Sequence, residues 1–306
     1  MKDKTSVDYI NLVAPVFATN KQGNEGRLVN WLDSEDGKKF GVRYNITDLR
    51  KTPKSVVNLS DDVYDATIVF KGEMITPKVL ANCSRPRVLY FPDDVLTYVL
   101  YAKLVQHIGK HYDIVYTFDK EAIPTFKYLG CTDVKWMPSW TGTDMFYDKG
   151  LKRDIDICFI GSFNEYRIRM MNTVKYFFKD KQLCFKEGIY GDDYADLMNR
   201  SKIVINAAQG SSGVSQRVFE ASACGAAVFT NYNKDLYDLF NEDEIVCWNN
   251  FDDLVNRLKL YFDNKDNIKI LGERGKTCTI HNHLAQHRFK QMVKDIETWK
   301  IKERAL

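Results

Sequence analysis

The sequence lacks long apolar runs, paired cysteine motifs and clustered metal ligands, and each absence excludes a class of protein. No apolar stretch approaches the roughly 20 residues of a membrane-spanning helix, and Met1–Thr5 lacks the apolar region of a secretory signal. The seven cysteines are scattered without CxxC spacing, which is typical of buried, reduced thiols. We therefore expect a cytoplasmic protein without a membrane segment.

Metal and common cofactor motifs are also missing. His283 and His287 are four residues apart and could lie on one helical face, but no further ligand appears at a suitable spacing, so we expect no metal. No lysine of the P-loop type follows Gly210–Gly213, and the chain has no GxGxxG sequence. These absences exclude a P-loop nucleotidase and argue against a nicotinamide cofactor.

The composition is that of a globular protein with balanced charge. The 306 residues include 44% hydrophobic and 28% charged residues, enough for two domains of ordinary size. Lysine and arginine total 44 and aspartate and glutamate 41, and both signs are spread over both halves of the chain. No basic half indicates a nucleic-acid partner, although a basic patch could still form on a folded surface.

Apolar runs alternate with helical patterns along the chain, which predicts an α/β fold with parallel sheets. The expected strands are Ile10–Phe17, Phe40–Asn45, Ala66–Phe70, Val88–Phe91, Ile114–Thr117, Val134–Met137, Ile155–Ile160, Leu183–Lys186, Ile203–Ala207, Ala226–Thr230 and Ile245–Trp248. Helices are expected between them, and residues 265–300 indicate two helices broken near 280–282. Two such series imply two doubly wound, Rossmann-like domains, at 1–145 and 146–282, followed by a C-terminal helix at 283–306.

The most informative segment is the strand, loop and helix of residues 203–229. A buried strand leads into the loop Gly210, Ser211, Ser212 and Gly213, and a short helix with Arg217 and Glu220 follows. Loop amides and a helix N-terminus can bind a diphosphate. A largely buried carboxylate needs hydrogen-bond donors, and the hydroxyls of a ribose would supply them. The alternative for Glu220 is a structural ion pair, for which Arg217 lies on the same helical face.

Here the sequence resembles a known family. The run Arg217–Ala226, preceded by Ile203–Asn206, resembles the donor site of GT-B glycosyltransferases, and most closely that of the CgeB-type spore-maturation group. Asp156–Ser162 with Arg167 resembles the opening of that family's second domain, and the likeness covers roughly residues 60–290. The resemblance implies two Rossmann-like domains facing across a cleft, with the last helix crossing back to the first domain.

The resemblance also implies roles for individual residues in the second domain. Gly161, Ser162 and Arg167 would contact the donor, and Tyr190 would stack on the nucleobase. The 210–213 loop and Arg217 would hold the diphosphate, and Glu220 the ribose. Many retaining members carry a second, earlier glutamate with seven residues between the two, at the position where this chain has Ser212. This difference leaves both the sugar and the stereochemistry open.

The first domain offers acceptor-side candidates. Asp93 and Asp94 follow a strand at the edge where open α/β sheets bind ligands, and Asp93 is the candidate base. The alternative is that either aspartate caps the next helix. Asn24 and Arg27 lie in the loop and helix start after the first strand and could shape the acceptor side, or belong to a plain connection.

Together these interpretations predict a metal-independent glycosyltransferase. It would move a hexose from a nucleoside diphosphate sugar, with UDP-glucose the expected donor, to an acceptor hydroxyl. The acceptor stays open among glycans, proteins, small molecules and a hydroxymethylated base in phage-type DNA. The alternatives are a non-catalytic nucleotide-sugar-binding scaffold and a UDP-sugar epimerase on the same fold. No cofactor besides the sugar donor is expected.

Overall fold

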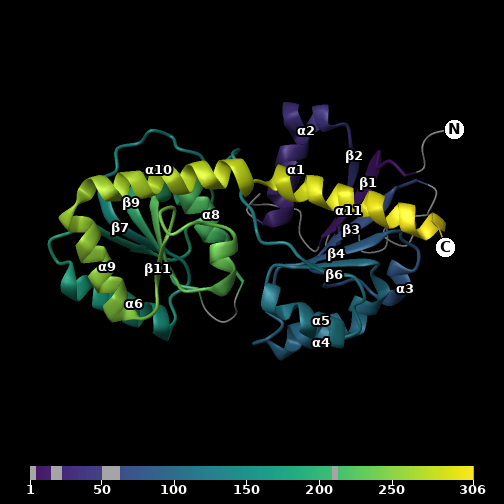
Figure 1. Cartoon of the computed structure of the whole chain (residues 1–306), viewed down its shortest axis with the longest axis horizontal. Helices are drawn as coiled ribbons and strands as arrows, with labels where there is room; N and C mark the ends of the chain where they lie inside the picture. Colours follow the sequence, from purple (N-terminus) through teal and green to yellow (C-terminus); the bar gives the residue numbers. More distant parts are fainter. Residues whose placement is uncertain (1–4, 15–22, 50–62, 209–212, 306) are drawn as a thin grey trace. The chain divides into compact units, whose positions relative to one another are not determined.

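The computed structural model describes residues 5–14, 23–49, 63–208 and 213–305 (Figure 1). The described residues form two compact units. The first contains the chain up to Pro138, Gly213, and the segment from Ala285 onward, and the second contains Ser139 to Ala208 and Val214 to Leu284. The sequence pattern predicts divisions at 145–146 and 282–283. The last helix thus belongs by its contacts to the first unit.

The first unit is built on a parallel sheet with the order β2-β1-β3-β4-β5-β6 among its described strands. The strands are β1 (Tyr9–Ala14), β2 (Arg43–Asp48), β3 (Ala66–Phe70), β4 (Arg87–Phe91), β5 (Ile114–Thr117) and β6 (Val134–Trp136). Leu12 of β1 is paired with Ile46 of β2 and with Ile68 of β3. The inner strands are buried on both faces, which is why they are continuous apolar runs in the sequence.

Helices complete the first unit. They are α1 (Asn24–Asp33), α2 (Glu35–Phe40), α3 (Pro77–Leu80), α4 (Val99–Ile108), α5 (Ile123–Tyr128) and α11 (Ala285–Ala305). The final helix packs against α1, where the Phe289 ring lies 5.8 Å from that of Trp31. Farther along α11, Asp295 accepts a hydrogen bond from the Tyr116 hydroxyl at 2.6 Å. These contacts lie within the first unit.

The second unit contains a parallel sheet with the order β11-β10-β9-β7-β8. Its strands are β7 (Ile155–Ile160), β8 (Leu183–Lys186), β9 (Ser201–Asn206), β10 (Ala227–Asn231) and β11 (Val246–Trp248). Its helices are α6 (Glu165–Phe177), α7 (Gly191–Arg200), α8 (Gln216–Ala223), α9 (Phe251–Asp263) and α10 (Lys265–Asn282). Val204 of β9 lies between Cys158 of β7 and Val228 of β10.

Apolar side chains fill both faces of the second sheet. One core joins Ile160 and Val204 to Met198 of α7 and Phe219 of α8. A second core, on the other strand face, joins Ile205 to helices α6 and α9. The unit is thus a three-layer α/β sandwich, and the α/β class with two parallel sheets is confirmed.

One element differs from the sequence prediction. Residues Phe40–Asn45 were expected to form a strand, but Phe40 ends α2 and the strand β2 begins at Arg43. Ser34 caps α2 by accepting a hydrogen bond from the Gly37 amide at 3.2 Å, and Gly41 ends it at φ 88°. Because this cap and the left-handed glycine define α2, strand β2 begins three residues later than predicted.

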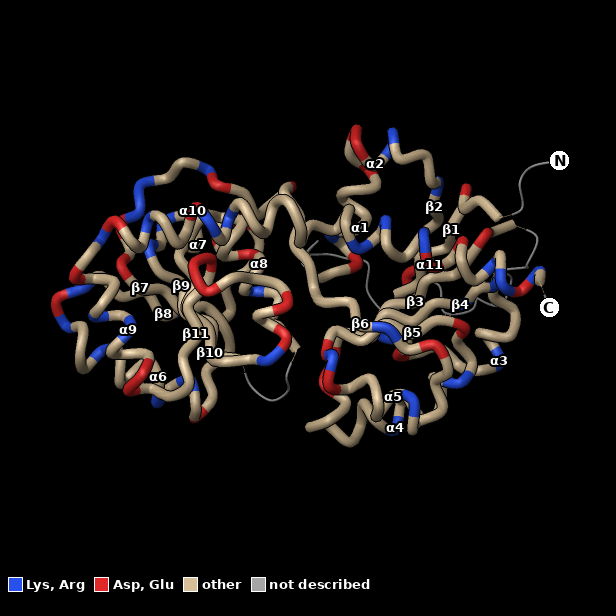
Figure 2. The backbone as a smooth tube through the Cα atoms, in the orientation of Figure 1, with Lys and Arg blue, Asp and Glu red and all other residues tan. Residues whose placement is uncertain are grey.

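The described residues have the mixed surface charge that is typical of a globular protein (Figure 2). Figure 2 shows basic and acidic residues interspersed over the described parts of both units. Among the described residues, no helix combines the length and the apolar content that a membrane span requires. In the same parts of the chain, no three His, Cys, Asp or Glu side chains come together as a metal site would need.

Candidate functional site

The predicted donor residues gather at the carboxyl ends of β7 and β9 in the second unit. Gly161 and Ser162 directly follow β7, and Arg167 lies in the first turns of α6. Arg217 and Glu220 lie on α8, which follows β9 along the chain. This is the sheet edge where open α/β folds bind ligands. Gly210, Ser211 and Ser212 lie outside the described residues.

Arg217 is held against the end of β7. Its Nη1 donates a hydrogen bond to Asn206 Oδ1 at 2.9 Å, and its guanidinium lies 5.4 Å from the centre of the Phe159 ring. A Cβ atom on Gly161 would lie 2.6 Å from Arg217 Nη2, so only glycine leaves room for the guanidinium here. The Nε of Arg217 is buried and has no hydrogen-bond partner among the described residues. Such an orphaned donor is costly unless a ligand satisfies it.

A second guanidinium lies on the same aromatic ring. Arg167 is 5.6 Å from the centre of the Phe159 ring, and its Nε donates to the Ala207 carbonyl at 2.9 Å. Its Nη1 donates to the Ser162 Oγ at 2.7 Å and to the Ser162 carbonyl at 3.0 Å. Two like charges placed on one ring repel each other, and a bound anion would relieve that repulsion. This arrangement suits a diphosphate.

Glu220 is almost fully buried, with 5% of its surface exposed. Its Oε2 accepts a hydrogen bond from the hydroxyl of Tyr194, which lies on α7, at 2.7 Å. No Glu220–Arg217 ion pair within 4 Å is present among the described residues, so the local alternative of a pair along α8 does not describe this carboxylate. Tyr194 itself was missed by the sequence reasoning, because it lies 26 positions away and no local pattern marks it.

The remaining donor-side candidates differ in their surroundings. Tyr190 is 64% exposed at the N-cap of α7, where its ring is open to solvent. Gly213 packs in the first unit, because a Cβ atom there would lie 2.2 Å from Phe118 Cε2. The structure therefore gathers Gly161, Arg167 and Arg217 into one group and gives Tyr190 and Gly213 other neighbours.

On the acceptor side, Asp93 follows β4 and is paired with Lys71, which follows β3. Lys71 Nζ lies 3.1 Å from Asp93 Oδ2. Burial disfavours the charged amine, but Asp93 outweighs this effect and the pKa of Lys71 is raised. Lys71 has a left-handed backbone with φ 63°, which is uncommon for a residue with a side chain and is found at functional sites.

The neighbouring aspartate has a different position. Asp94 Oδ1 accepts hydrogen bonds from the amides of Leu96 at 2.8 Å and Thr97 at 2.9 Å. This is the capping geometry of an Asx turn. Asp94 thus stabilises the chain turn that precedes α4, while the side chain of Asp93 faces Lys71.

Asn24 and Arg27 both lie on α1 and are buried, at 6% and 1% exposed. The Asn24 amide donates to the Tyr90 hydroxyl at 3.1 Å, which connects α1 to β4. Between them, Glu25 turns back over Gly23, whose added Cβ atom would lie 2.6 Å from a Glu25 carboxylate oxygen. Burial raises the pKa of Glu25, against the lowering effects of its own backbone amide, Lys71 and Arg27. Glu25 is thus close enough to Lys71 for the two side chains to interact electrostatically.

The histidines near the end of the second unit have structural contacts. His283 is 4% exposed, its Nε2 lies 2.9 Å from the Leu239 carbonyl, and its ring is 5.2 Å from that of Phe219. Arg288 donates from Nε to the Pro138 carbonyl at 3.3 Å, and burial lowers its pKa to about 10. Both residues pack helix ends rather than approach the donor group.

Known proteins resemble this chain in family and in fold. Residues 149–294 match the family described as "Glycosyl transferase-like". No curated protein matches the chain in sequence. An alpha-glucosyltransferase solved with UDP and DNA containing an HMU base is similar over 96% of this chain and 100% of its own, with a TM-score of 0.70 and 13% identity.

Two further solved structures have the same architecture. HepE of Anabaena, solved with UDP and glucose, covers 95% of this chain and 99% of its own, with a TM-score of 0.66 and 11% identity. Sucrose-phosphate synthase of Thermosynechococcus elongatus covers 97% of this chain and 99% of its own, with a TM-score of 0.62 and 11% identity. At these identities the likeness shows the fold alone, which is GT-B. With its glycosyl transferase-like match across residues 149–294, the chain is a glycosyltransferase of the GT-B type.

Proposed function

We propose that this enzyme transfers a hexose from a UDP-sugar, with UDP-glucose as the donor, to an acceptor hydroxyl. The observation that carries the proposal is the pair of guanidiniums of Arg167 and Arg217 on the Phe159 ring, next to Gly161. They provide fixed positive charge and, at Arg217 Nε, an unsatisfied donor. A leaving diphosphate is stabilised by positive charge and by hydrogen-bond donors, and this group offers both.

In this proposal Glu220 accepts hydrogen bonds from the ribose. The Tyr194 hydroxyl, which donates to Oε2 of Glu220, keeps the carboxylate in position. The acceptor oxygen forms a bond to the anomeric carbon as the bond from that carbon to the β-phosphate oxygen breaks. The electron pair leaves with the diphosphate, which the two arginines stabilise. Asp93 takes the proton of the acceptor hydroxyl, and Lys71, 3.1 Å away, orients the Asp93 carboxylate.

The arginines would take the role that a metal ion has in other transferases, so the reaction is proposed to be metal-independent. Sugar transfer at an unchanged rate in excess EDTA would support this part of the proposal. A rate that EDTA abolishes and Mg²⁺ or Mn²⁺ restores would reject it. We also infer a kinship with the CgeB-type group from residues 203–226, and a cytoplasmic location from the seven scattered, unpaired cysteines.

For the acceptor, we propose a hydroxymethylated base in DNA as the first candidate to test. The supporting observation is the solved alpha-glucosyltransferase that carries UDP and DNA with an HMU base, whose fold this chain shares along its length. Glucose transfer from labelled UDP-glucose to hydroxymethylated duplex DNA, and not to the unmodified duplex, would identify this acceptor. Transfer to glycans or small hydroxyl compounds instead would assign another one.

The donor part is tested first, by a thermal-shift panel of UDP, GDP, ADP and TDP. A ligand that binds only the native state raises the apparent stability, so UDP should give the largest shift. Glu220→Ala should then raise the Kd for UDP about tenfold or more, as expected for lost hydrogen bonds to a charged group. Glu242→Ala, an exposed glutamate of the same unit, is the matched control. UDP binding without any transfer or donor hydrolysis would point to a non-catalytic scaffold.

A further inference from the structure

A hollow in the second unit lies at the opposite edge of the sheet from the donor group. Its volume is about 520 Å³, within the range of small-molecule sites. Arg153 and Asp156 line it at the start of β7, Lys202 at the start of β9, and Gly225 just before β10. Helix α10 closes another side with Ile268 and neighbouring residues.

This hollow is separate from the donor group. Gly161 and Ala207 follow the carboxyl ends of β7 and β9, whereas the hollow is lined by the residues where these strands begin. Each of the two strands has six residues. At roughly 3.3 Å per residue, the two sites are about 20 Å apart along the sheet. A ligand in the hollow would therefore leave the donor residues free.

The three carboxylates that line the hollow already have cationic partners. Asp156 Oδ1 lies 2.6 Å from Lys202 Nζ, and Asp180 is paired with Lys181. Glu273 Oε2 lies 2.7 Å from Lys276 Nζ, a lysine on the same helix outside the lining. No lining carboxylate is therefore left to neutralise the remaining positive charges.

Two of those remaining charges come from α10. Lys265 and Lys269 are four residues apart on this helix, so they share a face, and both side chains are exposed. Within the described parts of the chain, neither amine has a carboxylate within 4 Å. With three paired carboxylates and five cationic side chains, the lining has an excess of positive charge.

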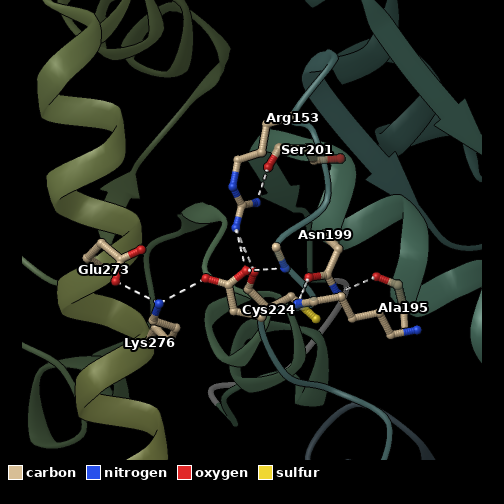
Figure 3. A network of polar contacts seen from close by, with 10 residues as sticks. Arg153, Ala195, Asn199, Ser201, Cys224, Glu273 and Lys276 are labelled. Atoms are coloured by element: carbon tan, nitrogen blue, oxygen red, sulfur yellow. Dashed lines mark hydrogen bonds and ion pairs between the residues drawn. The ribbon is translucent and has the colours of Figure 1, made fainter.

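Arg153 supplies a third charge, and its orientation is fixed. Its Nη1 donates to the Ser201 carbonyl at 2.6 Å and its Nη2 to the Cys224 carbonyl at 2.7 Å, as Figure 3 shows. The nearest carboxylate, on Asp148, is 4.0 Å away. Burial lowers the pKa of Arg153. Oδ2 of the same Asp148 carboxylate is paired with Lys276 at 2.9 Å, so Asp148 is shared between two cations and offsets the charge of Arg153 only in part.

The other lining groups are apolar or small. Phe262 and Ile268 provide an apolar wall. A Cβ atom on Gly225, at φ 74°, would lie 2.8 Å from Arg153 Nη2 and 3.3 Å from Asp148 Oδ2, so glycine leaves room for this ion pair. From this combination we propose that the hollow binds a phosphate monoester carried on a small ring. Arg153, Lys265 and Lys269 would bind the phosphate, and the ring would lie against Phe262 and Ile268.

The test uses phenyl phosphate as the probe, with inorganic phosphate and benzyl alcohol as its charged and apolar halves. Binding to the full chain is measured by calorimetry at low and at moderate salt, with UDP present to fill the donor site. Lys265→Ala/Lys269→Ala should raise the Kd for phenyl phosphate about tenfold or more and leave the Kd for UDP unchanged. Lys290→Ala/Lys294→Ala is the matched control, because it removes two exposed lysines at the same spacing from α11.

The possible outcomes separate this site from the donor site and from general charge attraction. Tighter binding of phenyl phosphate than of either half, lost only in the α10 variant, would establish the site. Equal loss in both double variants would mean non-specific attraction, and complete competition by UDP would place the probe at the donor group. Either result, or no binding of phenyl phosphate at all, would overturn the proposal. A failure of the UDP experiments alone would leave it standing.

Discussion

The hydroxyl of Tyr194 donates a hydrogen bond to Oε2 of Glu220 at 2.7 Å, and so connects helix α7 to helix α8. A hydrogen bond to a buried carboxylate fixes the direction of that carboxylate. Tyr194 is thus a positioning residue for Glu220, and the precision of ribose binding in the proposed reaction depends on it.

Tyr194→Phe removes the donor while it keeps the ring, so UDP affinity should fall about tenfold, as for a lost hydrogen bond to a charged group. Calorimetry with UDP and 2′-deoxy-UDP checks the mechanism, because the preference of the variant for the ribose should shrink. Tyr176→Phe, an exposed tyrosine of α6, should change neither affinity. If Tyr194→Phe keeps the full ribose preference, Tyr194 does not orient Glu220 for the ligand.

Gly161→Ala tests the arrangement of Arg217. The new Cβ atom would lie 2.6 Å from Nη2, so the guanidinium must move away from Asn206 and the Phe159 ring. UDP affinity should drop at least about tenfold, whereas uridine affinity should change little, because the loss falls on the diphosphate. The control is Gly150→Ala, which places alanine at another positive φ of 65° with nothing within 4 Å. Equal losses for UDP and uridine would argue for general damage to the unit.

Asp93→Asn should abolish transfer and leave UDP affinity intact, because an amide cannot accept the proton of the acceptor hydroxyl. Lys71→Ala should also slow transfer, since Asp93 then loses the cation 3.1 Å away. Single-turnover rates with saturating UDP-glucose measure both effects. Asp36→Asn, which changes an exposed aspartate of α2, is the charge-matched control. Wild-type rates in Asp93→Asn would move the base elsewhere, and Glu25 would be the next residue to test.

The pKa of Glu25 gives a prediction for stability against pH. Burial raises this pKa in the folded state, so between the ordinary value of 4.5 and the raised value the native protein binds more protons than the unfolded chain. Stability then falls as pH rises through this window. Glu25→Gln removes the ionisation, and it should raise the Tm at pH 7 while changing it little at pH 4. Thermal unfolding at both values checks this, and an equal change at both would contradict it.

Local sequence was enough to predict most strands of both sheets. Ile155–Ile160 and Ala66–Phe70 were predicted with the bounds that the structure has, because strands covered on both faces must be continuous apolar runs. Two helices near the end were also predicted, with a break near 280–282, and the structure has the break just after these residues, between Asn282 and Ala285. The one error, at Phe40, came from giving apolar residues more weight than the cap at Ser34 and the glycine at 41.

The donor group was partly predictable from the local spacing of its residues. Arg217 and Glu220 lie three residues apart on one helix after a buried strand, so their spacing alone places them together. Gly161 follows another strand, and the alternation of strands and helices places it at the same sheet edge.

Tertiary structure alone decided the partners of these residues. Tyr194 meets Glu220 and Lys71 meets Asp93 only after the strand orders 11-10-9-7-8 and 2-1-3-4-5-6 are set. The same holds for Arg153, Lys265 and Lys269, which line one hollow. The sequence by itself therefore determined the α/β class, the strands and the local donor motif, since these follow from short-range periodicity. Which distant side chains complete each site depended on packing between elements, which no local pattern records.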